Sequence, residues 1–535
     1  MFVRLSRTIW QDKLFYFISF LTLTYTIVTR IDKINSGLWN DESNNYFSFI
    51  KKGLLQIVWS DRFSPANHIL NSIFAWISYK IFGFSEVMLR MPSLIAGILA
   101  SILFFFFLKS KLGKLEALLF FVFAALCSEH IKIVSQLRGY GLCYLFSVIA
   151  LIMAYRAIGD RENSARFRKS ILIFSIVNFL AIYNFIPFVL LSCSFYLVLF
   201  FYLKGFRRIE LSISAILSIA LCGIAYIPAI SSLSNSYSSG FGQIVPKLHL
   251  LSFLSIPPRK IISFYIAQNI KSTAILSFYF LLCSIVLILG YYFARKKDEN
   301  LANLLVIPPS LTLLMGGVLK APLGSAISHP RYTCFLTFYY LAVFSIGLAY
   351  FFTLIYQKVQ ASRNGNEAIF QKNIYLFFGV TALCTILIFQ GFLISDKVFI
   401  IRGHYKEATQ AIEAFNIKKY KIFFNPSPNW AKNDAEVYFS EKLPNIQYKM
   451  HSIAKDGKAK ACQILQEMNE ITNTFVVEDL RLEYIPNSTY KVKDYAIVTG
   501  SDRQEFKVIS WQEKNRLLGV YFFQRGQVSS MDCEG

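Results

Sequence analysis

The sequence predicts an α-helical polytopic membrane protein, with about 11 spans, juxtamembrane helices in its first outer loop and a small soluble α/β domain at the C-terminus. Two features of its composition predict this fold class. Of the 535 residues, 55% are hydrophobic and 16% are charged, whereas about a quarter of a soluble domain is charged. The charge is also unevenly divided, because residues 1–396 carry a net formal charge of +20 and residues 397–535 carry +3. These features exclude a soluble enzyme, a disordered chain and a disulfide-stabilised scaffold.

Eleven apolar segments are long enough to be membrane spans, since a helix needs about 20 apolar residues to cross the hydrocarbon core. The first follows Arg4, Arg7 and Lys13, as a signal peptide would, but no small-residue cleavage site comes after it, so we expect it to be retained. The predicted spans are 14–29, 91–108, 115–134, 139–155, 170–184, 186–203, 211–229, 273–293, 301–319, 332–355 and 373–395.

The segment 66–82 is nearly long enough to cross but contains Asn67, His68, Asn71 and Lys80. Every second loop is basic only if this segment does not cross, and the basic loops then lie in the cytoplasm with the basic N-terminus. We therefore expect 66–82 to be an amphipathic helix on the outer face. The same bias explains the basic excess without a nucleic-acid partner. The basic loops are 109–114, 156–169, 204–208, 295–297 and 358–372.

This topology predicts two domains, a transmembrane domain over 1–395 and an extracytoplasmic α/β domain over 396–535. In the second, 404–416 is expected to be a helix, and the segments KIFF, TFVV and VYFF are expected to be strands. We expect the protein in the bacterial cytoplasmic (inner) membrane. The outer face then receives the long first loop (30–90), a second loop near 130–139 and the loops 231–272 and 320–331.

An adjacent acid pair, Asp41 and Glu42, stands out in the first outer loop, in the stretch LWNDESNNYF. Such a pair can supply a general base, a ligand for a divalent metal, or both. The alternative is a helix N-terminus, with Asn40 as cap and the acids in the first turn, where they match the helix dipole.

Two arginines, Arg138 and Arg331, end spans on the outer side in SQLRGY and SHPRYT. A guanidinium binds phosphate oxygens bidentately, so the pair could clamp a phosphate. Each could instead be a snorkelling anchor beside an interfacial tyrosine, such as Tyr140. Because both lie on the side where positive charge is disfavoured, the functional interpretation is favoured. His68 alone would more often be structural, but the amides of Asn67 and Asn71 on an apolar helix need partners.

Four motifs in order carry a family resemblance: Trp39-Asn40-Asp41-Glu42, the stretch SPANHILNSIFAWISYKIFGFSEVMLRMPSLIAG, then SQLRGYGL, then HPRY before a late span. Together, over about residues 1–350, they resemble the GT-C superfamily of membrane glycosyltransferases. The nearest branch contains protein O-mannosyltransferases, aminoarabinose transferases of lipid A and enzymes that decorate lipopolysaccharide cores.

The resemblance implies a polyprenyl-phosphate sugar as donor, Asp41 as the first-loop acid with Glu42 as its partner, and Arg138 and Arg331 facing the lipid phosphate. It also implies a juxtamembrane helix at 66–82. Two departures bear on metal use and on the acceptor. Many members have His-Pro-Pro where this chain has Asn67-His68-Ile69, and the second loop lacks the aspartate found in aminoarabinose transferases.

The predicted reaction is an inverting transfer of the sugar to a hydroxyl of a glycolipid, lipopolysaccharide or protein, with Asp41 as base. Beyond the two arginines, the donor-phosphate site is expected to include Lys320 and Tyr140. The substrate cavity is expected to include Arg62, Asn67, His68, Asn71 and Glu86. If a divalent metal such as Mg²⁺ or Mn²⁺ takes part, Asp41 is its candidate ligand.

Three other functions remain open from the sequence: a polysaccharide polymerase, a lipid-linked sugar flippase and a non-catalytic scaffold that displays the C-terminal domain. A flippase is expected to offer a charged path through the bundle, whereas no acid lies at the middle of any predicted span.

Overall fold

The computed structural model describes residues 2–59, 67–229, 273–318 and 330–361. In the C-terminal part it describes 406, 409–410, 421–425, 431–443, 447–450, 473–485, 489–492, 505–509 and 516–524. The chain forms two compact units. The first comprises Met1–Ile34 and Gly53–Ile400, and the second comprises Asn35–Lys52 and Ile401–Gly535. The second unit thus combines the C-terminal part with a short stretch of the first outer loop, which the sequence assigned to the membrane domain.

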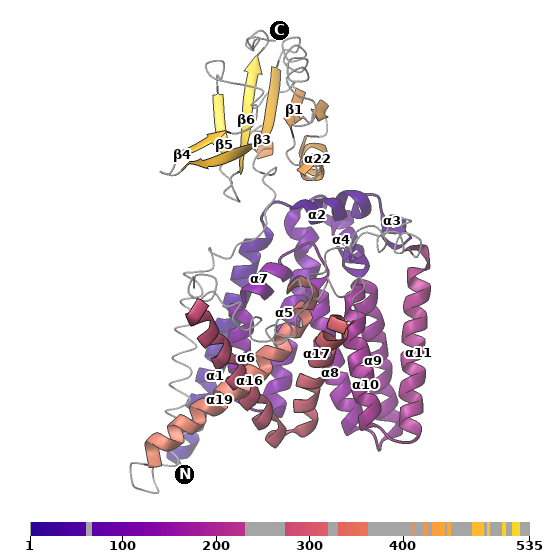
Figure 1. Cartoon of the computed structure of the whole chain (residues 1–535), viewed down its shortest axis with the longest axis vertical. Helices are drawn as coiled ribbons and strands as arrows, with labels where there is room; N and C mark the ends of the chain where they lie inside the picture. Colours follow the sequence, from indigo (N-terminus) through magenta and orange to yellow (C-terminus); the bar gives the residue numbers. More distant parts are fainter. Residues whose placement is uncertain are drawn as a thin grey trace. The chain divides into compact units, whose positions relative to one another are not determined.

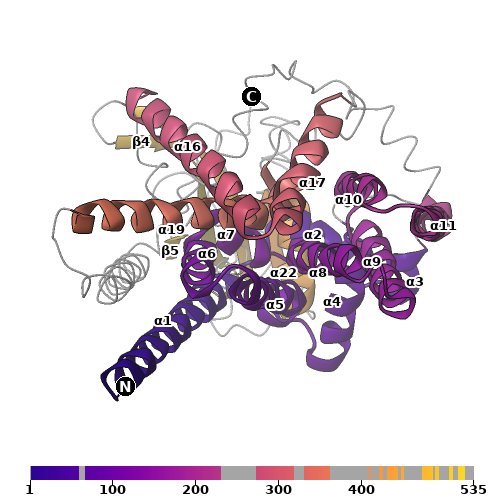
Figure 2. The ribbon, with the colours of Figure 1, turned by 90° about the horizontal axis from the view of Figure 1, so that it is seen from below.

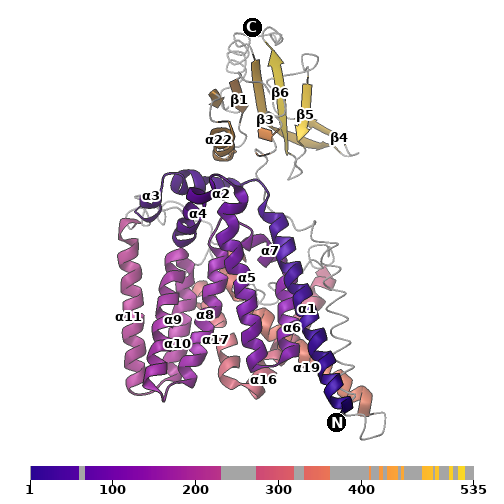
Figure 3. The ribbon, with the colours of Figure 1, turned by 180° about the vertical axis from the view of Figure 1, so that it is seen from behind.

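The first unit is a helical bundle (Figure 1). Helices α3 and α4 lie at one end of it, and α11 lies at its edge beside α9 and α10, as the views from below and from behind also show (Figures 2 and 3). Its helices are α1 (Phe2–Ile34), α3 (Leu54–Val58), α4 (Ile69–Phe82), α5 (Glu86–Lys111), α6 (Lys114–Leu126), α7 (Ser128–Val134), α8 (Tyr140–Gly159), α9 (Ser164–Asn184), η2 (Ile186–Phe188), α10 (Val189–Tyr202), α11 (Phe206–Tyr226), η3 (Ile227–Ala229), α16 (Thr273–Lys297), α17 (Glu299–Val318), η5 (Pro330–Leu336) and α19 (Thr337–Ala361).

Within the described ranges, five helices are long and apolar enough to cross a membrane: α1, α5, α8, α11 and the helical stretch Thr333–Leu354, which covers most of α19. The pair α6 and α7 makes a sixth if it is counted as one span. Helix α4 has 14 residues and is therefore about 21 Å long, short of a crossing. Its length fits the juxtamembrane helix expected at 66–82. The predicted span 373–395 lies outside the described residues.

The predicted continuous span 115–134 is wrong in one respect, because it breaks at Cys127 and α6 meets α7 at 60°. The buried guanidinium of Arg30 explains the break. It donates hydrogen bonds to the carbonyl oxygens of Ala124 and Ala125, each at 3.2 Å. These carbonyls belong to the last turn of α6, where they have no partner within the helix. A cation at a helix C-terminus also interacts favourably with the helix dipole.

Close backbone contact joins α16 to α19. A Cβ atom added to Gly290 would collide with the carbonyl of Val343, and one added to Gly347 would collide with the carbonyl of Val286. Small residues at such a crossing let two helices approach, which is how helices commonly associate inside membranes. Glycine is therefore required at both positions by the packing of this pair.

The second unit contains a mixed sheet with strand order β2-β1-β3-β6-β5, and β4 pairs with β3. Strand β1 runs parallel to β2 and β3, whereas β6 runs antiparallel to β3 and β5. Strands β1, β3 and β6 contain the segments KIFF, TFVV and VYFF, and most of 404–416 lies outside the described residues. The strands are β1 (Lys421–Asn425), β2 (Gln447–Met450), β3 (Asn473–Ile485), β4 (Thr489–Val492), β5 (Glu505–Ile509) and β6 (Arg516–Gln524).

Three helical segments complete the described part of this unit. Helix α22 (Ala431–Lys442) follows β1 and precedes β2 in the chain, so it connects two neighbouring parallel strands, as crossover helices do. From the stretch Asn35–Lys52 come α2 (Asn40–Asn45) and the π-helix η1 (Tyr46–Ile50), both of which pack against α22.

Candidate functional site

The acid pair lies in the first turn of α2, in the second unit. Glu42 is buried, and its Oε2 accepts a hydrogen bond from the backbone N–H of Trp39 at 3.1 Å. Trp39 is the residue that caps the helix, not Asn40 as the capping alternative assumed. Glu42 is therefore the third helical residue of a capping box, and its carboxylate binds the backbone N–H of the capping residue. Asp41 is partly exposed and is not one of the two residues of the capping box.

In the first unit, Arg138 is the centre of a buried aromatic cluster. Its side chain is 1% exposed, and its Nε donates a hydrogen bond to Nε2 of His68 at 3.3 Å. The guanidinium carbon lies 5.5 Å from the ring centroid of Tyr140, within the range of a cation–π contact. His68 in turn stacks on Phe185, with ring centroids 5.1 Å apart and planes 6° from parallel. We call Arg138, His68, Tyr140 and Phe185 the Arg138 cluster.

The hydrogen bond from Arg138 determines the state of the imidazole. An arginine side chain has only donors, so Nε2 of His68 must accept and cannot carry a proton. His68 is then neutral, with its proton on Nδ1. Arg138 lies just before α8, and the first backbone N–H groups of a helix favour an anionic ligand.

Asn184, at the end of α9, holds the surroundings of this cluster together. Its Nδ2 donates to the carbonyl oxygen of Gly139 at 2.8 Å, and its Oδ1 accepts from the backbone N–H of Asn71 at 3.2 Å. It thereby ties the start of α8 to α4. The close contact also explains the glycine after Arg138, because a Cβ atom on Gly139 would collide with the amide of Asn184.

Gly141 has a similar reason, since a Cβ atom there would collide with the backbone of Ser93 in α5. Its N–H donates to Oγ of Ser93 at 3.2 Å. Sequence reasoning selected Arg138 and Tyr140 but missed Asn184 and Ser93. The two glycines on either side of Tyr140 were the available signal, since closely spaced glycines often mark close backbone contacts.

The other described residues that were predicted to line the substrate cavity are Asn67, Asn71 and Glu86. The side-chain amide of Asn67 donates to the carbonyl oxygen of Ile57 at 3.1 Å, which is a structural role. Asn71 is fully buried, and within the described structure neither its Oδ1 nor its Nδ2 has a hydrogen-bond partner. Glu86 is buried at the first position of α5, directly after the capping residue Ser85. Such an acid favours the positive end of the helix dipole.

For three further predicted site residues, the structure describes no side chain. Arg62 and Lys320 lie outside the described residues. The backbone of Arg331 lies in η5, and its side chain is not among those described. The convergence of Arg331 with Arg138 therefore stays a prediction. Helix η5 does pack against α7 and α8, so its backbone lies near the helix that Arg138 precedes.

The end of the bundle that holds α4 contains further buried cations that the sequence analysis did not select. Arg90 donates to the carbonyl oxygen of Ile34 at 2.9 Å and so caps the last residue of α1. Lys33 pairs with Asp32 at 2.8 Å. Arg30, besides holding the end of α6, lies 2.7 Å from Nδ1 of His130. Their signal in the sequence was the same as for Arg138, positive charge on the predicted outer side.

The carboxylate of Glu129 lies in the first turn of α7. Oγ1 of Thr337, at the start of α19, donates to Oε2 of Glu129 at 3.5 Å. Among the described residues, no group of three or more His, Cys, Asp or Glu side chains could hold a metal ion.

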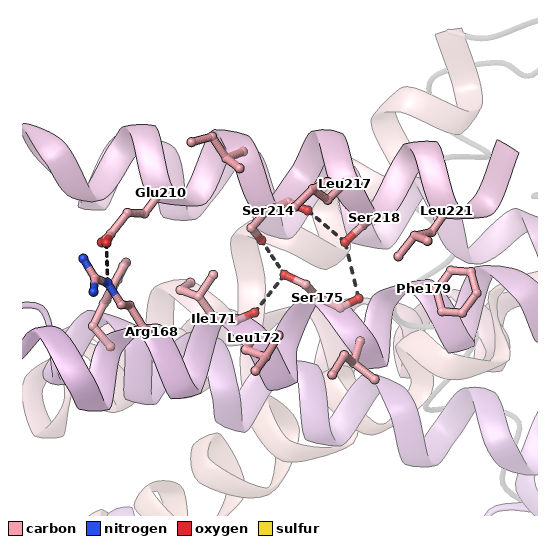
Figure 4. A pocket seen from close by; sticks show the side chains of 13 residues that line it. Arg168, Ile171, Leu172, Ser175, Phe179, Glu210, Ser214, Leu217, Ser218 and Leu221 are labelled. Atoms are coloured by element: carbon pink, nitrogen blue, oxygen red, sulfur yellow. Dashed lines mark hydrogen bonds and ion pairs between the residues drawn. The ribbon is translucent and has the colours of Figure 1, made fainter. Parts of the chain in front are cut away.

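A groove lies between α9 and α11, with a volume of about 380 Å³ and mostly apolar walls. Figure 4 shows Ser175, Ser214 and Ser218 hydrogen-bonded to one another across the two helices. Arg168 pairs with Glu210 at one end, at 2.7 Å. Because these polar groups satisfy one another, this groove is a helix-packing feature of the kind that serine-rich membrane helices form.

No protein-family model and no curated protein matches the sequence. The chain is similar in fold to ArnT, an aminoarabinose transferase from Cupriavidus metallidurans, in its apo state, with a TM-score of 0.52 and 10% identity over 94% of this chain and 97% of ArnT. ArnT bound to undecaprenyl phosphate gives a TM-score of 0.52 and 10% identity over 96% and 99%. A complex of the oligosaccharyltransferase AglB from Archaeoglobus fulgidus gives a TM-score of 0.47 and 11% identity over 91% of this chain and 74% of AglB.

This likeness confirms, at the level of fold, the resemblance that the four sequence motifs predicted. The chain shares the fold of ArnT. Together with its long apolar helices, the fold makes it an integral membrane protein.

Proposed function

We propose that this protein is a glycosyltransferase that moves a sugar from a polyprenyl-phosphate donor to a hydroxyl group of a glycolipid, lipopolysaccharide or protein. Transfer takes place at the outer face of a bacterial inner membrane. The fold supports the class of reaction, since ArnT of the same fold has been captured with undecaprenyl phosphate. The Arg138 cluster is the observation that carries the proposal on this chain's own residues.

The Arg138 cluster has the properties that a donor phosphate needs. A buried guanidinium acts in a low dielectric, where a fixed positive charge stabilises an anion more strongly than it would in water. Its orientation is held by the hydrogen bond to His68 and by the ring of Tyr140. It also directly precedes α8, whose first backbone N–H groups and dipole favour a phosphate.

The reaction needs a base and a stabilised leaving group. Asp41 takes the proton from the acceptor hydroxyl as its oxygen forms a bond to the anomeric carbon. The bond from that carbon to the phosphate oxygen breaks, and its electron pair stays on the lipid phosphate. A single displacement inverts the anomeric configuration, so one carboxylate suffices. Arg138 offsets the charge that develops on the phosphate, and Glu42 shapes the helix that carries Asp41.

Binding of undecaprenyl phosphate to the purified protein in detergent tests the phosphate site. We expect Arg138→Gln to weaken binding by roughly 10- to 100-fold, since a hydrogen bond to a charged group contributes about 1.5–3 kcal/mol. Arg168→Gln is the matched control, because Arg168 lies in the groove between α9 and α11 and pairs with Glu210. Equal binding by the Arg138 variant and the wild type would contradict the proposed phosphate site.

Transfer itself is tested in proteoliposomes with total polyprenyl-linked glycolipids extracted from the source bacterium. The proposal expects one sugar per turnover from a monophosphate donor. Joining of pyrophosphate-linked units would instead identify a polymerase, and movement of the lipid-linked sugar without a new glycosidic bond would identify a flippase.

A further inference from the structure

A short segment of the first outer loop is built into the C-terminal domain. Residues Asn35–Lys52, which carry Asp41 and Glu42, form one compact unit with Ile401–Gly535. We call Asn35–Lys52 the acidic loop. About 350 residues of membrane domain separate it in sequence from its partners. Three contacts with side chains of the C-terminal part join the acidic loop to this unit.

The first contact holds the chain just before α2. The backbone N–H of Leu38 donates a hydrogen bond to the hydroxyl oxygen of Tyr438 at 2.8 Å. Leu38 and Tyr438 are both fully buried. A buried N–H group without an acceptor costs free energy, so this hydroxyl is a specific requirement at that point. Asp41 follows three residues later.

The second contact holds the other end of the acidic loop. Nζ of Lys51 lies 2.6 Å from Oε1 of Glu441 and 3.2 Å from Oγ of Ser440. The Glu441 side chain is only 13% exposed, so water screens this ion pair less than it would screen one on an open surface. Lys51 directly follows η1, whose last turn its backbone N–H closes on Tyr46.

The third contact is at the first residue of the acidic loop. Nζ of Lys406 donates to the carbonyl oxygen of Asn35 at 2.9 Å and to its side-chain oxygen at 3.2 Å. Lys406 belongs to the C-terminal part of the chain, as Tyr438 and Glu441 do. The acidic loop is thus held at its first residue, before α2 and after η1.

One face of α22 supplies two of these three contacts. Tyr438 and Glu441 are three residues apart, so they lie on the same side of the helix. That side packs against both α2 and η1. A single rigid element therefore sets the distance between the two ends of the helical pair that carries the acids.

We infer that the C-terminal domain is the scaffold of the acidic loop, and that Tyr438 and Glu441 are positioning residues that hold Asp41 in place for transfer. This rests on the proposed function. A reacting group that is misplaced by about 1 Å can cost on the order of 100-fold in rate, so a scaffold that fixes the backbone of α2 acts on turnover. The domain then serves the base, whether or not it also contacts the acceptor.

The inference predicts an effect that a merely stabilising domain would not have. Loosening the contacts between α22 and the acidic loop should slow transfer at saturating donor while leaving affinity for undecaprenyl phosphate unchanged, because Arg138 belongs to the other unit. General destabilisation would lower both.

The experiment uses the full-length chain with Tyr438→Phe, Lys51→Glu, Glu441→Lys and the double variant with the charges exchanged. Three quantities are measured for each: hydrogen exchange of peptides that cover 35–52, affinity for undecaprenyl phosphate, and transfer in proteoliposomes with the extracted glycolipids. Lys52→Glu is the matched control. Lys52 is the neighbouring lysine, is exposed, and has no ion pair or hydrogen bond within the described structure.

For each single variant we expect faster exchange in the acidic loop, unchanged lipid affinity and a loss of transfer of roughly 5- to 100-fold for Tyr438→Phe. Exchanging the charges of Lys51 and Glu441 should restore exchange and transfer toward wild-type values. Unchanged exchange in all variants, or loosened exchange with unchanged transfer, would overturn the inference. A wild-type protein without any transfer would overturn the proposed function instead. The hydrogen-exchange data would then still show whether α22 holds the acidic loop in place.

Discussion

Arg138 and His68, 70 residues apart in the sequence, are joined by a hydrogen bond of 3.3 Å from Nε to Nε2. The bond orients the guanidinium and keeps the imidazole neutral, since arginine only donates. The pairing gives His68 a role through Arg138 and leads to the first prediction.

Replacing His68 should weaken phosphate binding according to whether an acceptor remains. His68→Leu removes the acceptor, and we expect affinity for undecaprenyl phosphate to fall by about tenfold, the effect of one charge-assisted hydrogen bond. His68→Gln keeps an oxygen that can accept and should retain most of the affinity. Titration of the detergent-solubilised variants measures this, and equal losses for both would speak against the orienting role.

The two acids of α2 should behave differently. Asp41→Asn removes the base and should lower transfer by on the order of 100- to 10,000-fold. Glu42→Gln keeps a side-chain oxygen for the N–H of Trp39, so helix α2 persists and the loss should be far smaller. Initial rates in proteoliposomes measure both. Similar losses for the two variants, or wild-type turnover by Asp41→Asn, would remove Asp41 from its assigned role.

Asn184 should matter for stability more than a buried asparagine elsewhere on the same helix. Asn184→Leu leaves the N–H of Asn71 and the carbonyl of Gly139 without their partner, at a cost of about 1–3 kcal/mol for each buried group. Asn178 is the matched control, because its described bond goes to Phe174 within its own helix. Thermal unfolding in detergent compares them, and a smaller shift for Asn184→Leu than for Asn178→Leu would contradict the bridging role.

The contact between α16 and α19 should not tolerate a side chain. Gly347→Leu would drive a side chain into the backbone of Val286, so we expect a lower unfolding temperature or loss of the folded protein. At Gly223 in α11 a Cβ atom meets nothing within 4 Å. Gly223→Ala should therefore be neutral or stabilising by up to about 1 kcal/mol. If Gly347→Leu were as stable as the wild type, the helices would not pack as closely as described.

Some features of the protein follow from local sequence alone. Apolar length predicted the positions of α5, α8, α11 and α19, because crossing a hydrocarbon layer requires a continuous run of apolar residues in the chain itself. The alternation of basic loops predicted that 66–82 does not cross, and α4 has only 14 residues. The order of four motifs was enough to predict the superfamily fold that the comparison with ArnT supports.

Local sequence misled where a distant residue competes with it. The run 115–134 was predicted to be one span, yet it breaks at Cys127, where Arg30 binds the carbonyl oxygens at the end of α6. The sequence could not distinguish the role of Asp41 from that of Glu42. In the structure they differ because Glu42 accepts a hydrogen bond from the backbone N–H of Trp39.

By itself, then, the sequence determined that the chain is a helical membrane protein, where α5, α8, α11 and α19 lie, and the residue types available for a transfer reaction. Only the tertiary structure decided that His68 orients Arg138, that Asn184 joins α4 to α8, and that the acidic loop belongs with a domain 400 residues away. The reason is physical. Helix formation depends on neighbours in the chain, whereas these contacts depend on which buried donors and acceptors meet once the helices have packed.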